Sequence, residues 1–218
     1  MMPLNLFTSA TFSGANLLAF FIYGAMGIMF FFMPIIFIAG WDRHEISVSV
    51  VFAPMALFMT VFSTRAGALA DRIGPAPLLA AGSLITGAGY LLIGFFAEAQ
   101  LLCAHILPSM CLVAFGMSLV VAPLSTALMG AAPDGLSGIA SGVNNAVSRT
   151  ASLLGVAAVG GVAATVYLRA GGAASFGIPS DTEGHAAAMS QSLTALAYIS
   201  AGLCLLSAVI SLNLFRRG

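Results

Sequence analysis

Long apolar runs separated by short polar stretches organise this chain of 218 residues. No charged residue precedes Asp42, and long charge-free gaps recur further along the sequence. A helix needs roughly 20 apolar residues to cross the hydrocarbon core of a bilayer. The runs are continuous rather than alternating, which favours helices over strands. We therefore expect six membrane-spanning helices, at about residues 13–38, 47–66, 76–97, 101–129, 138–168 and 190–214.

Composition supports a membrane protein and excludes other classes. Hydrophobic residues make up 60% of the chain and charged residues 6%, too few to cover the surface of a soluble domain. The net charge is zero and the sequence contains no Lys, so nucleic acid is not an expected partner. The cysteines form no metal-ligand pair, and we expect no cofactor and no metal site. The predicted fold class is an all-α integral membrane protein, a single domain over residues 1–218 that has the lipid bilayer as a partner.

The arginines predict the orientation. An even number of spans puts both termini on one side of the membrane. That side would carry Arg65, Arg72, Arg216 and Arg217. The other side would carry only Arg43 and Arg169. Cytoplasmic loops carry the excess of positive charge, so we expect both termini to be cytoplasmic and the protein to lie in the inner cell membrane.

Two aromatic residues fit this orientation. Trp41 and Tyr167 would fall at the outer interface, where amphipathic rings are favoured. Residues 169–190, rich in Gly and Ala, would form an outer loop.

Residues 67–75 read Gly-Ala-Leu-Ala-Asp-Arg-Ile-Gly-Pro and predict a polar turn between the second and third spans. Gly67 would allow close helix approach, and Gly74 would take a positive φ to end the turn. Asp71 suits backbone N–H groups or a helix N-terminus, and Arg72 can hold a carbonyl or carboxylate in a fork. These four residues are a candidate conformational latch. The alternative is a capped turn with solvated charges.

This turn resembles the loop that major facilitator superfamily transporters carry after the second helix of each half. Further segments resemble the C-terminal half of the 14-helix drug:proton antiporter branch: residues 16–18, 23–25, 116–127, 138–146 and 154–157. The resemblance implies a six-transmembrane-helix half of a major facilitator bundle, and we expect the N-terminal six-helix half to be absent. Two departures make the cytoplasmic face less basic than in the family: residues 75–77 read Pro-Ala-Pro, and Ser137 precedes the fifth span.

Polar residues inside the spans are the candidates for lining a cavity. In the fifth span, Ser141, Asn145, Ser148, Ser152 and Gly155 share one helical face, and Gly138 and Gly142 form a Gly-x-x-x-Gly pair beside it. A helix-packing seam and a cavity lining both explain such a stripe. Arg149 is the one charged residue well inside a span, so it is a functional candidate. The predicted cavity residues are Asn16, Tyr23, Asn144, Asn145, Ser148 and Arg149.

The expected function follows from the resemblance. It implies that the first, second, fourth and fifth helices line a central cavity, and that the chain is half of a multidrug or small-molecule efflux transporter. Its substrate would be small and hydrophobic or cationic, with proton-coupled antiport. No Asp or Glu lies in the middle of a span, so a coupling carboxylate would belong to the other half. We expect the chain to be incomplete on its own and to need a second six-helix half or a homodimer.

Two alternatives stay open. The chain could be a non-transporting membrane subunit or a truncated remnant. It could also be a rhomboid-like intramembrane serine protease, because residues 135–138 read Gly-Leu-Ser-Gly and His185 precedes the last span. The predicted topology puts Ser137 and His185 on opposite sides, whereas a nucleophile needs its base within hydrogen-bond reach. We therefore expect that the chain is not an enzyme.

Overall fold

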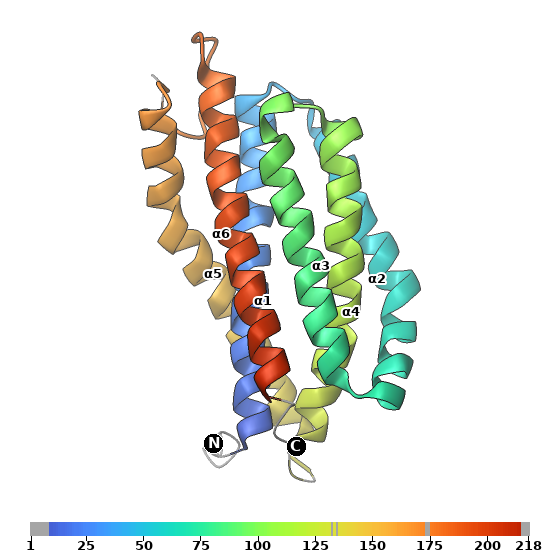
Figure 1. Ribbon diagram of the computed structural model, residues 1–218. Helices are drawn as coiled ribbons and strands as arrows, with labels where there is room; N and C mark the ends of the chain where they lie inside the picture. The colour runs from blue at the N-terminus through green and yellow to red at the C-terminus, as the bar shows by residue number, and fades with distance from the viewer. Residues whose placement is uncertain (1–8, 132, 134, 173–174, 215–218) are drawn as a thin grey trace.

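The computed structural model of the chain is a bundle of long helices (Figure 1). It describes residues 9–131, 133, 135–172 and 175–214. Among the described residues, six helices are long and apolar enough to cross a membrane, and none of the secondary structure is strand. The predicted all-α membrane fold class is therefore confirmed. The elements in chain order are α1 (Ala10–Ile35), η2 (Ile36–Gly40), α2 (Glu45–Ile73), α3 (Pro75–Phe96), η3 (Ala97–Ala99), η4 (Leu102–Ile106), α4 (Leu107–Gly130), α5 (Ser137–Arg169) and α6 (His185–Leu214).

Two helices extend well past the apolar runs from which they were predicted. α2 continues to Ile73 rather than ending near residue 66, and α6 begins at His185 rather than near residue 190. At 1.5 Å per residue, α2 is about 44 Å long, whereas the hydrocarbon core is roughly 30 Å thick. An apolar run marks the part of a helix inside the hydrocarbon, and polar residues continue the same helix into water.

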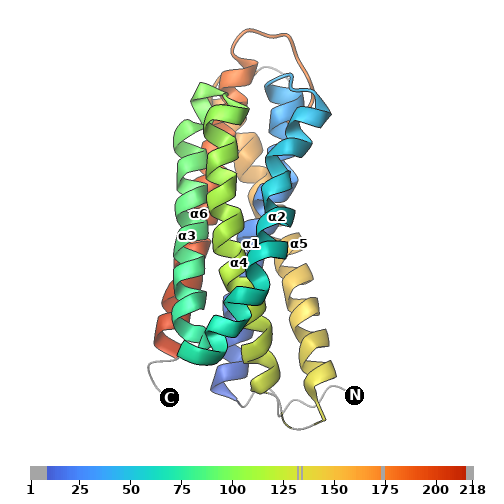
Figure 2. The same ribbon diagram turned by 90° about the vertical axis from the view of Figure 1, so that its right-hand side faces the viewer.

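α1 begins and α6 ends at the lower end of the bundle in Figure 1. The α2–α3 and α4–α5 connections lie at the same lower end, and the other three connections lie at the upper end (Figures 1 and 2). Arg65 and Arg72 therefore sit toward the lower end, and Arg43 and Arg169 toward the upper end, as the topology predicted. The predicted orientation also depends on Arg216 and Arg217, which lie outside the described residues.

The helices form two three-helix units of opposite direction. α1 packs against α5 and α6, and its counterpart α4 packs against α2 and α3. α3 and α6 pack against each other where the units meet. Because α1 begins at the lower end and α4 at the upper end, the consecutive triplets α1–α3 and α4–α6 cross the bundle in opposite directions, which is the topology of inverted repeats in transporters.

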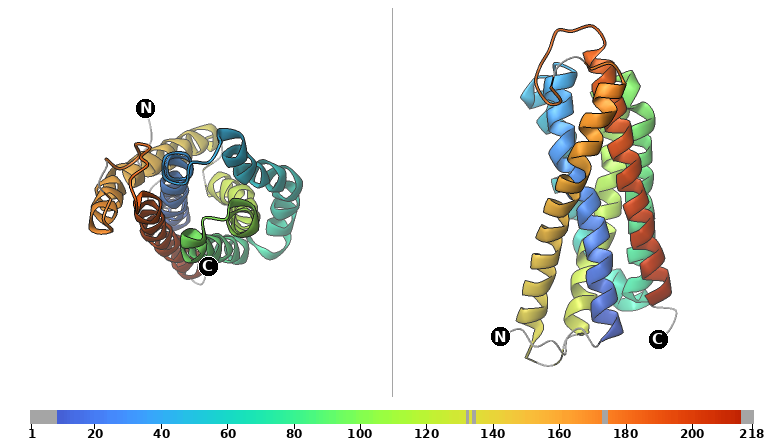
Figure 3. Two further views of the ribbon diagram at one scale, coloured as in Figure 1. Left: turned by 90° about the horizontal axis from the view of Figure 1, so that it is seen from above. Right: turned by 90° about the vertical axis from the view of Figure 1, so that its left-hand side faces the viewer.

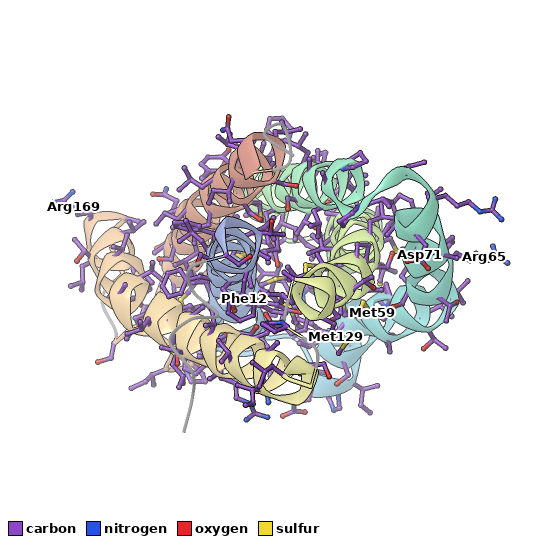
Figure 4. All side chains as sticks on the ribbon, turned by 90° about the horizontal axis from the view of Figure 1, so that it is seen from below. Phe12, Met59, Arg65, Asp71, Met129 and Arg169 are labelled. Atoms are coloured by element: carbon purple, nitrogen blue, oxygen red, sulfur yellow. The ribbon has the colours of Figure 1, made fainter. Side chains whose placement is uncertain are left out.

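α2 and α5 are the least covered helices. Within their most apolar windows, 17% of α2 and 22% of α5 is buried, against 61% of α3. Seen from below, α6 and α3 lie along one side of the bundle, α1 and α4 lie at its centre, and α5 and α2 flank the other side (Figure 4). The bundle therefore has one well-packed side and one side whose flanking helices have few partners within the chain.

Candidate functional site

The predicted turn at residues 67–75 is almost entirely helical. α2 includes Gly67, Asp71 and Arg72 and ends at Ile73, and α3 begins at Pro75. Gly74 alone connects them, with φ of 84°, so its predicted positive φ is what the structure has. The prediction of a longer polar turn was wrong because Ala and Leu, strong helix formers, alternate with the polar residues here.

The four latch residues make few contacts. Asp71 and Arg72 are exposed, and neither side chain has a hydrogen bond or ion pair to any residue that the structure describes. Gly67 lies beside α4, where an added Cβ would stand 3.8 Å from the Cβ of Ala122, an ordinary contact distance. Gly67 is therefore not required for close approach within this chain. A latch at this end needs a partner from outside the described residues.

α1 and α5 cross along a seam of small residues. The Ser152 hydroxyl is 3.0 Å from the carbonyl oxygen of Tyr23, to which it donates. An added Cβ on Gly27 would stand 2.7 Å from the Cα of Ser152, and one on Gly155 would stand 3.0 Å from the carbonyl oxygen of Gly24. At these positions the backbones are too close for a larger residue. The upper part of the predicted polar stripe is thus a helix-packing seam.

The lower part of the same stripe packs differently. Ser141 and Asn145 are exposed, and nothing lies within 4 Å of a Cβ added to Gly138 or Gly142. The Gly-x-x-x-Gly pair therefore forms no seam with the described residues, contrary to that interpretation. The physical reason is that α5 separates from α1 toward the lower end (Figure 3, right).

A hollow of about 470 Å³ opens beside the seam, lined by Tyr23, Ser148, Arg149, Ser152 and Leu153. We call it the Arg149 hollow. It brings together three of the predicted cavity residues, Tyr23 and Arg149 with Ser148. Asn145 joins them indirectly, because its side-chain oxygen accepts a hydrogen bond of 3.3 Å from Nε of Arg149.

Asn16 and Asn144 do not line this hollow. Asn16 is 5% exposed and donates from Nδ2 to the carbonyl oxygen of Phe12 at 2.9 Å. The side-chain oxygens of Asn16 and Asn144 are both buried and have no hydrogen-bond partner among the described residues. They are acceptors without a donor, which is uncommon in a folded protein.

Arg149 has no counter-ion within the described chain, where the one ion pair joins His44 and Glu45. The acidic residues that the structure describes all lie in a loop or near a helix end: Asp42, Glu45, Asp71, Glu98, Asp181 and Glu183. Arg149 is in the twelfth position after the start of α5, well inside the span. Inserting an Arg at the centre of a membrane helix costs about 2.5–3.5 kcal/mol, so this position needs a compensating interaction.

A second polar cluster, which the sequence did not predict, lies at the upper end. His185 is buried, its Nε2 is 3.0 Å from the carbonyl oxygen of Ala39, and its Nδ1 is 2.7 Å from the hydroxyl of Tyr167. A carbonyl oxygen only accepts, so Nε2 carries the proton and the Tyr167 hydroxyl donates to Nδ1. We call these residues, with Trp41 and Ser190, the upper network.

Trp41 and Tyr167 belong to this network and are buried inside the bundle. Trp41 is 5% exposed and donates from Nε1 to the hydroxyl oxygen of Ser190 at 2.9 Å, and Tyr167 is fully buried. Each ring faces into the bundle at its upper end because it finds a polar partner on α6, and the predicted place at the outer interface stays a prediction. A lone histidine at the start of an apolar span was the signal that could have pointed to such a cluster.

The residues that a serine protease would need are not assembled in the structure. Ser137 begins α5 at the lower end and His185 begins α6 at the upper end, so the two cannot form a nucleophile–base pair (Figure 1). Within the described ranges, no group of three His, Cys, Asp or Glu side chains is placed to hold a metal ion.

Comparison with known proteins adds one finding. The family model described as Major Facilitator Superfamily matches residues 3–156, which include α1 to α4 and the lower half of α5. No curated protein sequence matches the chain.

Proposed function

The chain belongs to the Major Facilitator Superfamily, a family of membrane transporters, and from that premise we propose that it is the C-terminal half of a small-molecule exporter. The segments that resemble the 14-helix drug:proton antiporter branch support export of drugs or similar compounds. The family match and the six long apolar helices identify a multi-pass membrane protein of a transporter family.

One observation carries this proposal: the Arg149 hollow lies between α1 and α5, and α5 is one of the two least covered helices. Transporters of this kind bind substrate near the bilayer midplane between two structural units and move by rocking one unit against the other. A six-helix unit with a polar hollow beside its open side supplies one wall of such a site. The second wall comes from a second six-helix unit.

Coupling to protons then depends on the second wall. An intramembrane carboxylate commonly serves as the coupling group, and the acidic residues in the described part of the chain lie near helix ends or in loops. If the second unit is a different chain, it carries that carboxylate. In this proposal the protein lies in the inner membrane, and the lower end of the bundle is on its cytoplasmic side because Arg65 and Arg72 lie toward that end.

The experiment that tests the proposal is drug efflux by the 218 residues with and without a second unit. Expressed alone, the chain should give no drug resistance above an empty vector. Co-expressed with a six-helix N-terminal half of the same branch, it should raise resistance and energised dye efflux. Energised efflux from the purified chain alone would contradict incompleteness. Stable association with an N-terminal half without efflux of any tested dye would favour a non-transporting subunit.

A further inference from the structure

The Arg149 hollow has a marked excess of hydrogen-bond donors. An arginine carries five N–H donors, and only Nε of Arg149 is engaged, with Asn145. The terminal nitrogens of Arg149 and the hydroxyl of Tyr23 have no partner among the described residues. Ser148 and Ser152 are already committed as donors to backbone carbonyls at 2.8 and 3.0 Å. A ligand in this hollow therefore meets unused donors and one positive charge.

We propose that the Arg149 hollow binds an oxyanion, a carboxylate or a phosphate group, between the guanidinium of Arg149 and the hydroxyl of Tyr23. The planar guanidinium fork matches the two oxygens of such a group. This inference rests on the proposed function and narrows its substrate class. The cationic substrate expected from the sequence would meet a like charge here.

The oxyanion has two possible sources, a substrate or a side chain of a second protein unit. A second copy of this chain is a poor source, because the acidic residues that the structure describes lie near helix ends or in loops, away from the level of Arg149. A carboxylate from a different six-helix chain or from a free substrate satisfies the same donors. The test has to separate these two sources.

The first arm uses phenylglyoxal, a reagent selective for arginine, on the purified chain in phosphatidylcholine nanodiscs. Modification of each arginine is measured by peptide mass spectrometry. The competitors share one ring system: 2-naphthoate, neutral 2-naphthamide and 2-naphthylmethylammonium. We expect saturating naphthoate to slow modification of Arg149 about tenfold, whereas the other two leave its rate unchanged. Arg169, exposed at the upper end, is the internal control and should react equally throughout.

The second arm measures naphthoate binding directly by its fluorescence. Arg149→Gln should weaken binding about tenfold or more, Arg149→Lys should retain part of it, and Arg169→Gln should match the unaltered chain. Equal naphthoate affinity in Arg149→Gln and Arg169→Gln would overturn the proposal. So would tighter binding of the ammonium analogue than of naphthoate.

The third arm identifies the source in native membranes without probe. An Arg149 that reacts in the purified chain but is protected in native membranes supports a carboxylate from a second chain. Reaction in both settings, with protection by naphthoate, supports a free substrate. Reaction in both without protection overturns the site. If naphthoate binds but no pairing with a second unit gives efflux, the transporter proposal alone is contradicted. If efflux occurs and is unchanged by Arg149→Gln, and naphthoate does not protect Arg149, the oxyanion site alone is contradicted.

Discussion

Similar small and polar residues have different surroundings in the lower and upper halves of α5. Above Ser152, two such residues have partners on other helices: Gly155 lies against α1, and Tyr167 is fully buried and hydrogen-bonded to His185. Below it, a Cβ added to Gly142 would have no neighbour within 4 Å, and Arg149 has no counter-ion among the described residues. The same residue types serve helix packing in one half and are left unused in the other.

The difference shows where this chain is self-sufficient. A polar group without a partner is costly in the hydrocarbon of a membrane, whether it is buried in the protein or faces lipid, so an isolated stable unit should satisfy its polar groups internally. The upper half meets this requirement around His185. The lower half does not meet it at Asn144 or Arg149, which fits a surface that another molecule completes.

The largest expected effect is at His185. His185→Ala removes both hydrogen bonds of the imidazole and leaves the Tyr167 hydroxyl and the Ala39 carbonyl without partners. We expect the free energy of unfolding to fall by about 2–3 kcal/mol. The measurement is reversible unfolding in mixed micelles by SDS titration. If His185→Ala lowered the free energy of unfolding no more than a substitution at an exposed site does, the upper network would not stabilise the upper half.

A smaller effect is expected at the seam. Gly27→Ala would place a methyl group 2.7 Å from the Cα of Ser152 and force α1 away from α5. The expected loss is about 1–2 kcal/mol by the same titration. Gly142→Ala is the matched control. It meets open space and should leave stability unchanged or raise it by about 0.5–1 kcal/mol, because Ala favours helix more than Gly. Equal losses in both variants would erase the contrast between the halves.

A third test removes one hydroxyl at a time. Tyr167→Phe leaves Nδ1 of His185 without its donor, and we expect a loss of about 1 kcal/mol, typical of a hydrogen bond between membrane helices. The control is Tyr198→Phe, since Tyr198 is 46% exposed and its hydroxyl makes no hydrogen bond in the described chain. Thermal melting followed by size-exclusion chromatography should show a lower midpoint only for Tyr167→Phe. A matching drop for Tyr198→Phe would point to a general effect of losing a phenol.

The smallest expected effect is at Arg149. Its side chain is exposed and its single bond to Asn145 is long, at 3.3 Å. Arg149→Gln should change the free energy of unfolding of the isolated chain by no more than about 0.5 kcal/mol. A loss as large as that of His185→Ala would show that Arg149 is structural, and the contrast between the halves of α5 would fail.

The fold was largely predictable because hydropathy alone marks the six spans. The ends of the helices were harder to predict. In α2, Asp71 and Arg72 belong to a helix that leaves the hydrocarbon, and no change in helix propensity signals its end before Gly74. Polarity indicates where the membrane stops, whereas the backbone conformation of a single glycine indicates where the helix stops.

The candidate site was predictable only in part, because it depends on contacts between distant segments. Periodicity placed Ser148 and Ser152 on one face of α5, and the charge pattern singled out Arg149. The pairing of Tyr23 with Ser152, 129 residues apart, follows from how α1 and α5 cross. Likewise, nothing in the sequence near His185 predicts that Tyr167 and Ala39 are its partners.

The connection at Gly74 has a mechanical consequence. One residue joins α2 to α3, so only its two backbone dihedrals separate the directions of these helices, whereas the longer segment 170–184 joins α5 to α6. A displacement of the lower end of α2 is passed directly to α3, which packs against α6. No single-residue connection ties α5 to α6 in this way. A rocking motion would therefore carry α2 and α3 together, whereas it puts no such constraint on α5 and α6.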